Sequence, residues 1–378
     1  MADEEKTATC SEIPYGSGLA RGGLGAVDAG VALSFRCRRF RLWQNQSLFG
    51  LRGRLEIWNR WDAKSYLELA QFGYKPPGPL REFSVVHFPL YPWFVRIGSY
   101  LTSDYLASAF LVSGLALLVG AILLRLIALD FEAPVALRAV WFFLIFPSAY
   151  FLHVPYAESL FIALVLGAFM ATRANRWWLA GILGALVCLT RPPGIVIIPA
   201  LGVEVIHQWW KTRRWQHRWL WLLLAPCGFA AYMWLSQWAL GDPLAFLRLR
   251  RDFFHVSLAP PWIGLYNAWG NRGQFGTAGE MVGNQEFIFC LLGLVFTIVS
   301  WFRLRPSYAT WMTGNWLLFT STTYLQSVPR YTLTLFPMFI LFGFIGEKNR
   351  FWNALITVWS LLYLALFSTA FVRGLWAF

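Results

Sequence analysis

Charged residues are scarce in this sequence: Asp, Glu, Lys and Arg together make up 13% of its 378 residues. The charged side chains are too few to cover the surface of a soluble globular protein of this length. The composition therefore excludes the ordinary classes of soluble protein. Hydrophobic residues make up 57% of the chain, recur in long runs, and include an aromatic share of 18%. The composition therefore predicts an all-α polytopic membrane protein in contact with the lipid bilayer.

Cysteine is also rare, with five residues, three of which lie inside apolar runs. Their spacing matches neither a disulfide framework nor a metal site. The loop that holds Asp62 has further acidic residues, but no tight carboxylate pair marks a divalent-cation site. We therefore assign no metal ligand and no certain cofactor, and leave a divalent-cation requirement open.

Positive charge is in excess, and the net charge is +13. The Lys and Arg residues form short clusters between apolar runs, which is the pattern of cytoplasmic membrane loops. Membrane topology explains this excess better than a nucleic-acid partner does.

A membrane crossing needs about 20 apolar residues, and the sequence offers ten candidate spans, several of them short. The two that flank Arg191-Pro192-Pro193-Gly194 are either one kinked helix or two spans that meet at a turn. The ten ranges are 105–124, 135–151, 156–172, 178–190, 194–210, 219–240, 285–302, 308–325, 331–346 and 351–371.

The basic clusters predict which connections face the cytoplasm. They lie at residues 125–138, 173–176, 211–218, 303–305 and 348–350. If these face inward and the Pro-Pro element is a turn, the other connections face outward: 55–104, 153–158, 191–194, 241–284 and 326–331. The long outer loop runs against the charge rule, since it carries Arg248, Arg250, Arg251 and Arg272. Such a cationic cluster suggests an anionic partner.

We expect three regions: a poorly defined segment 1–54, a first outer loop 55–104 with interfacial helices, and a bundle of about ten spans, 105–378, with the outer loop 241–284. Placing Asp62 outside from a cytoplasmic start requires one more span before it. The best apolar run there, 24–35, is short and interrupted by Asp28.

Two motifs lie in the first outer loop. Residues 62–72 suit a helix at the membrane interface that stops at Gly73. Taken alone, Asp62 is better explained as the N-cap of that helix than as a catalytic group. The following HFPLYP motif predicts a rigid aromatic turn, in which His87 has no evident partner and is better explained as a structural hydrogen bonder.

Other ionisable residues lie where spans begin. Glu158 opens a span, either as a helix-start carboxylate or as a group directed into a cavity. Arg191 lies between apolar segments, which favours a functional role. Arg330, followed by Tyr331, stands near a helix start, where a guanidinium and free N–H groups can meet a phosphate.

Together these residues are more specific than any one of them. A carboxylate near two arginines beside a hydrophobic bundle suits sugar transfer from a lipid-phosphate donor. The carboxylate takes the proton of the acceptor hydroxyl, and the arginines stabilise the charge on the departing phosphate. We assign Asp62 as the general base. We assign substrate or donor-phosphate binding to Arg191, Arg330, Glu158, Tyr331 and His87.

Six motifs occur in the order found in a known family: WDAKSYLELAQFGY, HFPLYP, PYAESLF, TRPPG, GDPLAF and SVPRYTLTLFPMF. Over about residues 58–339 the chain resembles the GPI mannosyltransferase II family and its bacterial relatives, of the GT-C class. The resemblance implies a GT-C fold, a polyprenyl- or dolichyl-phosphate-mannose donor, inversion at the anomeric carbon, and a catalytic aspartate that maps onto Asp62. His87 stands where Phe is common in the family.

The expected activity is hexosyl transfer, mannosyl by resemblance, from a polyprenyl-phosphate donor to an unidentified glycan or lipid hydroxyl. The expected place is the extracytoplasmic face of the cytoplasmic membrane. A flippase or transporter of lipid-linked saccharides is the alternative, but transporters often show internal repeats and this sequence shows none. A membrane scaffold is a third reading.

Overall fold

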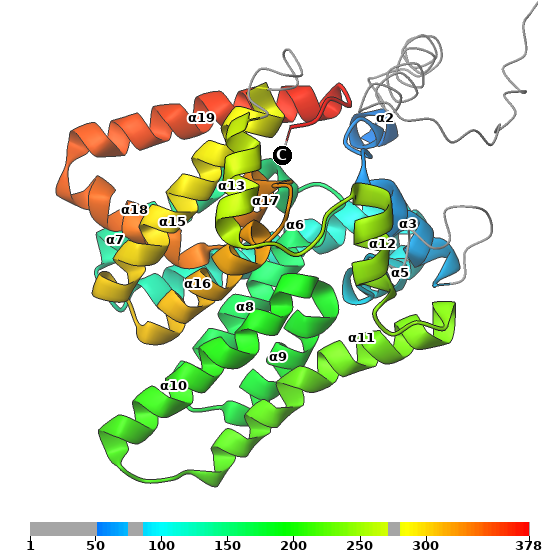
Figure 1. Cartoon of the computed structure of the whole chain (residues 1–378). Coiled ribbons are helices and arrows are strands. Elements are labelled where there is room, and N and C mark those ends of the chain that lie inside the picture. The colour runs from blue at the N-terminus through cyan, green and yellow to red at the C-terminus, as the bar shows by residue number, and fades with distance from the viewer. Residues whose placement is uncertain (1–50, 75–85, 271–279, 378) are drawn as a thin grey trace, which may run out of the picture. The chain divides into compact units, whose positions relative to one another are not determined.

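Helices make up the regular structure of the residues that the computed structural model describes, which are 51–74, 86–270 and 280–377 (Figure 1). Among these residues the single β-type pairing is an isolated bridge between Leu258 and Thr322. The predicted all-α class is confirmed. The chain divides into two units, residues 1–53 and 54–378, and the arrangement below is that of the second unit. The predictions made for residues 1–50 and for Arg272 lie outside the described residues.

Each of the ten candidate spans overlaps a helix of the structure. In chain order they are α6 (Tyr105–Ala128), α7 (Ala133–Ile145), α8 (Glu158–Arg173), α9 (Trp177–Thr190), α10 (Ile197–Thr212), α11 (Ala225–Leu240), α15 (Glu286–Arg303), α16 (Pro306–Thr320), α18 (Phe336–Lys348) and α19 (Arg350–Val372). Within the described residues, four helical stretches are long and apolar enough to cross a membrane: Tyr105–Ala128, His217–Leu240, Gly283–Arg303 and Arg350–Val372.

The Pro-Pro element is a turn between two helices. Helix α9 ends at Thr190, Arg191 is extended, and a 3₁₀ turn, η2 (Pro192–Val196), leads into α10. Gly194 lies so close to α9 that an added Cβ would stand 2.4 Å from the Val187 carbonyl oxygen. The chain therefore folds back at Arg191, as the two-span alternative requires.

Two of the predicted spans are broken. After α7 the chain continues through Phe146 into a short 3₁₀ turn, η1 (Ala149–Leu152). The span predicted at 331–346 begins earlier, as a separate one-turn helix, α17 (Val328–Thr332), and α18 starts only at Phe336. A proline in the first turn of each helix explains these starts, because proline favours that position. Arg330 and Tyr331 therefore lie on their own short helix.

The predicted outer loops also contain helices. The first holds α2 (Leu51–Glu56), α3 (Asp62–Phe72) and α5 (Leu90–Thr102). As predicted, α3 ends at Gly73, whose φ is +74°. Loop 241–284 holds α12 (Ala245–Phe254), α13 (Pro261–Gly270) and a π-helical turn, η4 (Glu280–Gln285). Helices α12 and α13 were not predicted from the sequence.

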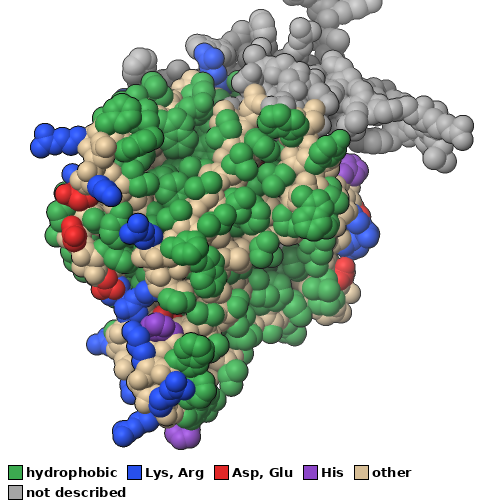
Figure 2. Space-filling model, turned by 60° about the vertical axis from the view of Figure 1, so that its left-hand side comes forward, with side chains coloured by type: hydrophobic (Ala, Val, Ile, Leu, Met, Phe, Trp, Pro, Cys, Tyr) green, Lys and Arg blue, Asp and Glu red, His purple; other side chains and the backbone are tan. Residues whose placement is uncertain are grey.

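Burial differs sharply between helices. Helix α8 packs against α6 and α9, and most of its residues are buried. Helices α6 and α19 instead expose many large apolar side chains, including Leu115, Leu118 and Leu362. Figure 2 shows hydrophobic side chains over much of one face, with charged side chains toward its borders. Such a face suits contact with lipid.

Four of the five connections predicted to be cytoplasmic lie together at one end of the bundle. Arg173 pairs with Asp130, Arg305 lies 3.8 Å from Asp130, and Arg138 pairs with Glu347. Helix α8 runs from Glu158 to Arg173, a length of about 24 Å at 1.5 Å per residue. The residues gathered around Glu158 therefore lie at the opposite end. Which end faces the cytoplasm stays a prediction.

Candidate active site

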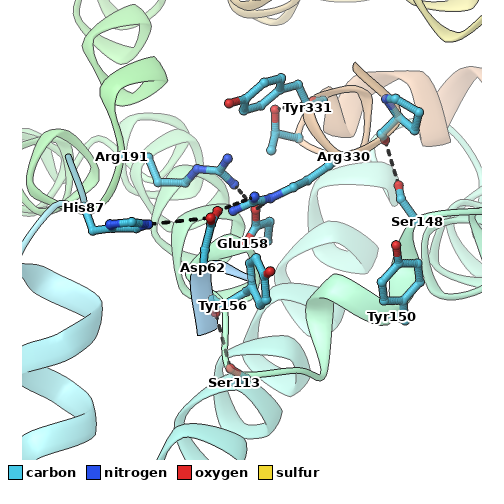
Figure 3. Close-up of polar contacts among 12 residues, drawn as sticks. Asp62, His87, Ser113, Ser148, Tyr150, Tyr156, Glu158, Arg191, Arg330 and Tyr331 are labelled. Carbon is cyan, nitrogen blue, oxygen red and sulfur yellow. Dashed lines mark hydrogen bonds and ion pairs between the residues drawn. The ribbon is translucent and has the colours of Figure 1, made fainter. Parts of the chain in front are cut away.

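Four charged side chains from distant parts of the sequence meet at this opposite end (Figure 3). Asp62 is the first residue of α3, and Glu158 is the first residue of α8. Arg191 follows α9 at the turn, and Arg330 lies on α17. The fold thus brings the predicted carboxylate into one cluster with both predicted arginines.

Arg330 links the two carboxylates. Its Nη1 donates to Asp62 Oδ2 at 2.8 Å, and its Nε donates to Glu158 Oε1. Arg191 Nη1 donates to the same Glu158 oxygen at 2.5 Å. Glu158 therefore holds both guanidinium groups side by side, a placement the sequence could not distinguish from a solvated helix start.

The members of this cluster differ in exposure. The side chain of Glu158 is fully buried and that of Arg330 is 5% exposed, whereas that of Asp62 is 31% exposed. Asp62 is consequently the carboxylate that a molecule from outside can reach. Glu158 serves as a fixed internal anion.

Aromatic rings surround the two guanidinium groups. Arg330 lies 4.6 Å from the ring centre of Tyr156 and 5.0 Å from that of Phe151. Arg191 lies 5.5 Å from the ring of Tyr331 and 5.8 Å from that of Phe161. Cation–π contacts of this kind help to keep a buried guanidinium charged. Tyr331 thus joins the site through Arg191.

Asp62 is not an N-cap, contrary to the simpler interpretation of the sequence. Helix α3 begins at Asp62 itself, and Trp61 precedes it with a φ of +52°. The Asp62 carboxylate binds Arg330 instead of the backbone of its own helix. A carboxylate in the first turn still interacts favourably with the helix dipole.

His87 has a partner that the sequence did not reveal. Its Nε2 lies 3.8 Å from Asp62 Oδ1. Arg330 binds the other carboxylate oxygen, Oδ2. The ring packs edge-on against Tyr66, with centres 4.8 Å apart, and the His87 carbonyl accepts the hydroxyl proton of Tyr74. The sequence showed no partner for His87, and the structure places its ring beside Asp62.

These neighbours set the protonation of Asp62. Burial, the largest single influence, raises the pKa of the carboxyl group, while Arg330 and His87 lower it. The lowering prevails, so the pKa of Asp62 lies well below its ordinary value. Asp62 is ionised at neutral pH.

Glu286 supports the site and was missed by the sequence analysis. This buried residue opens α15, and its two carboxylate oxygens accept the N–H groups of Ser327 at 2.7 Å and Val328 at 2.6 Å. Those N–H groups stand at the start of α17, the helix that carries Arg330. Ser148 Oγ also donates to the Pro329 carbonyl at 2.7 Å. The signal was a lone carboxylate at a span start, the same signal that drew attention to Glu158.

Among the described residues, no three His, Cys, Asp or Glu side chains lie close enough together to hold a metal ion. A divalent-cation requirement stays untested.

Comparisons with known proteins agree with the predicted resemblance. No family model matches the chain. It is 32% identical over 164 residues to GPI alpha-1,6-mannosyltransferase 2 of Mus musculus, which covers 40% of this chain and 32% of the mouse protein. The Rattus norvegicus protein of the same name is 30% identical over 152 residues, and this match covers 37% of this chain and 30% of the rat protein. The matches thus span about a third of the length of these relatives.

The fold is similar to that of ArnT from Cupriavidus metallidurans in a crystal structure bound to undecaprenyl phosphate. The TM-score is 0.52 with 15% identity, over 92% of this chain and 73% of ArnT. The two results together confirm the resemblance to GPI mannosyltransferases and the GT-C fold.

Proposed function

We propose that this chain is an inverting glycosyltransferase that moves a hexosyl unit, mannosyl by resemblance, from a polyprenyl-phosphate donor to an acceptor hydroxyl. The reaction takes place at the extracytoplasmic face of the cytoplasmic membrane. The observation that carries the proposal is the pairing of a reachable carboxylate, Asp62, with the buried guanidinium of Arg330.

The donor class rests on charge and fold together. Two guanidinium groups lie within one cluster beside a hydrophobic bundle, and Arg is the side chain best suited to phosphate. The ArnT structure of the same fold holds undecaprenyl phosphate. We therefore assign the donor phosphate to Arg330 and Arg191, with its prenyl chain among the apolar helices.

In the transfer step, the acceptor oxygen attacks the anomeric carbon from the face opposite the phosphate. The bond between that carbon and the phosphate oxygen breaks, and its electron pair leaves with the polyprenyl phosphate. The acceptor proton moves to Asp62. Arg330 and Arg191 stabilise the negative charge that grows on the leaving phosphate, and the configuration at the anomeric carbon inverts.

Donor binding would also strengthen the base. In the free protein Arg330 lowers the pKa of Asp62, which makes the carboxylate a weak proton acceptor. A donor phosphate that shares the Arg330 guanidinium would weaken its bond to Asp62 and raise the pKa of the carboxyl. Glu158 would meanwhile hold both arginines in place, because its bonds to them lie on the buried side of the cluster.

Release of polyprenyl phosphate by the purified protein tests this proposal. Wild-type protein supplied with polyprenyl-phosphate-mannose and membrane lipids should release it, and Asp62→Asn should lower the rate by at least about a hundredfold. Glu68→Gln, on the same helix but outside the cluster, is the matched control and should retain activity. Normal turnover by Asp62→Asn would reject the mechanism, and sugar movement across vesicles without bond cleavage would favour a carrier.

A further inference from the structure

The connection between α2 and α3, residues 57–61, lies directly before the proposed general base. Its last residue, Trp61, has a φ of +52° and a ψ of −124°, a backbone region that residues with a side chain rarely adopt. Such a conformation persists only where the surrounding structure holds it. Asp62 follows at once as the first residue of α3. The contacts that hold Trp61 therefore also set the position of Asp62.

A segment from the other end of the sequence contacts this connection through two aromatic pairs. Residues 371–377 comprise the end of α19, red in Figure 1, and the residues that follow it. The Trp376 ring lies edge-on to that of Trp61, with centres 5.4 Å apart. The Phe371 ring stacks on that of Trp58, with centres 6.2 Å apart. Aromatic pairs of this geometry contribute beyond the area that they bury, so the segment supports both tryptophans of the connection.

Two hydrogen bonds hold the same connection. Arg60 Nε donates to the Val372 carbonyl at 3.2 Å, and this is one of the last carbonyls of α19, which have no partner within the helix. The Tyr156 hydroxyl donates to the Arg60 carbonyl at 3.1 Å. Tyr156 is also the ring that lies 4.6 Å from Arg330. The connection is thus bonded both to residues 371–377 and to an aromatic ring of the candidate active site.

The 371–377 segment has anchors of its own. Helix α19 ends in a Schellman motif, in which Gly374 has a φ of +74° and the N–H group of Leu375 donates to the Ala370 carbonyl at 2.9 Å. This turn leads the chain back to η1, where the Tyr150 hydroxyl donates to the carbonyl of the fully buried Ala377 at 2.9 Å. Because the segment is fixed on both sides of Trp376, it can serve as a support.

The arginines of the cluster and the start of α3 have different supports. Both guanidinium groups are bonded to Glu158, whereas Trp61 packs against Trp376. Replacing Trp376 should therefore displace Asp62, while the arginines that we assign to the donor phosphate keep their places.

We infer that Trp376 is a positioning residue for the transfer reaction: its contact with Trp61 holds the strained connection in the conformation that places Asp62 beside Arg330. The effect on turnover rests on the proposed function. A residue that acts by position affects the rate more than it affects binding, since a displacement of about 1 Å can lower a rate by about a hundredfold.

The effects on kcat and on KM test this role in the full chain, supplied with membrane lipids and polyprenyl-phosphate-mannose. Trp376→Ala should lower kcat for polyprenyl phosphate release by at least about tenfold and change the KM for the donor by less than about twofold. Trp376→Phe, which keeps an aromatic edge at this position, should restore most of the rate. Trp352→Ala, at an exposed tryptophan near the start of α19, is the matched control and should retain the wild-type kcat.

Equal losses of kcat in Trp376→Ala and Trp352→Ala would overturn the inference while the proposed transfer stands. So would a loss confined to the KM for the donor, because the segment would then support the arginines instead of Asp62.

A double-mutant cycle tests whether Trp376 acts through Trp61. Trp61→Ala and Trp376→Ala remove the same contact, so the double variant should lose no more kcat than the worse of the two single variants. Losses that multiply would show two independent effects and would overturn the route through Trp61.

Hydrogen exchange at the start of α3 tests the contact without any turnover. The N–H group of Ala63 donates to the Arg60 carbonyl at 3.1 Å, and that of Lys64 donates to the Trp61 carbonyl at 3.3 Å. Relaxation of Trp61 breaks these bonds, so both amides should exchange at least about tenfold faster in Trp376→Ala. Amides of α8 should keep their wild-type protection. Unchanged exchange at the start of α3, or faster exchange throughout the bundle, would overturn the inference.

This measurement separates the inference from the proposed function. If the wild-type protein releases no polyprenyl phosphate, the proposed function fails, and exchange still decides whether Trp376 holds the start of α3. Trp376→Leu keeps an apolar side chain at this position without the aromatic ring. It replaces Trp376→Ala if that variant does not fold, with the same expected results and the same contradicting ones.

Discussion

Two sets of ion pairs at opposite ends of the helix bundle use the same chemical groups in different surroundings. At one end, Glu158 and Arg330 are buried and bonded across α3, α8 and α17. At the other end, Arg138 and Glu347 form an ion pair in which each side chain is about one-third exposed. Exposed pairs contribute about 0–1 kcal/mol to stability, whereas a buried charge that loses its partner costs several times more. The difference between these two pairs identifies the cluster of Glu158 and Arg330 as a place where charge is kept despite its cost.

The largest expected effect comes from replacing Arg330, which tests the contrast between the buried cluster and the exposed ion pair. Arg330→Ala should abolish transfer and lower the free energy of unfolding by about 3–5 kcal/mol, because Glu158 is left buried with only Arg191. Thermal unfolding in detergent and polyprenyl phosphate release measure the two effects. A variant that is as stable as wild type would show that the cluster does not behave as a buried network.

Glu286→Gln is expected to have the next largest effect. The amide retains one acceptor oxygen for the two N–H groups at the start of α17, so one of them loses its partner, at about 1–3 kcal/mol. We expect a lower kcat and a higher KM for the donor, because Arg330 is displaced. Ser148→Ala, which removes one neutral hydrogen bond to the same helix, should cost less. Equal effects of the two variants would contradict a special role for Glu286.

The stability of the wild type should depend on acidic pH differently from that of Asp62→Asn. Because the pKa of Asp62 is lowered in the folded protein, ionised Asp62 stabilises the fold above its unfolded pKa of about 3.9. This contribution is lost as pH falls from about 5 toward the lower folded pKa. The stability difference between wild type and Asp62→Asn should therefore shrink over that window. A constant difference between pH 6 and pH 3 would contradict the stabilisation by Arg330.

The smallest effect is expected at the opposite end. Arg138→Gln removes an ion pair whose side chains are each about one-third exposed, and it should change the free energy of unfolding by less than about 1 kcal/mol, with transfer unchanged. Adding salt should weaken this pair more than the buried cluster. A loss of activity comparable with that of Arg330→Ala would remove the distinction between the two ends.

Much of the fold could be predicted because apolar runs alone indicate where the helices lie. Each of the ten predicted ranges overlaps a helix, and the stop at Gly73 follows from its backbone freedom. The break before α18 and the helices of loop 241–284 were missed. Helix α17 is a single turn inside an apolar stretch, and α12 contains three arginines and an aspartate among its ten residues, so neither stands out by hydropathy.

The site could be predicted only in part. Asp62, Arg191 and Arg330 stand out as charges at the borders of apolar runs. The partner of His87 and the role of Glu286 could not be predicted, since each depends on a contact between residues at least 25 positions apart in the sequence. A single sequence records the identity of such residues but not their distances.

The sequence by itself determined that the chain is a helical membrane protein, where its apolar helices lie, and which charged residues stand out at their ends. Only the tertiary structure decided that Glu158 holds two arginines, that Asp62 binds Arg330 instead of capping its helix, and that Glu286 fixes α17. The reason is physical: hydropathy is a local property summed along the chain, whereas the cost of burying a charge is offset by partners that folding brings from other helices.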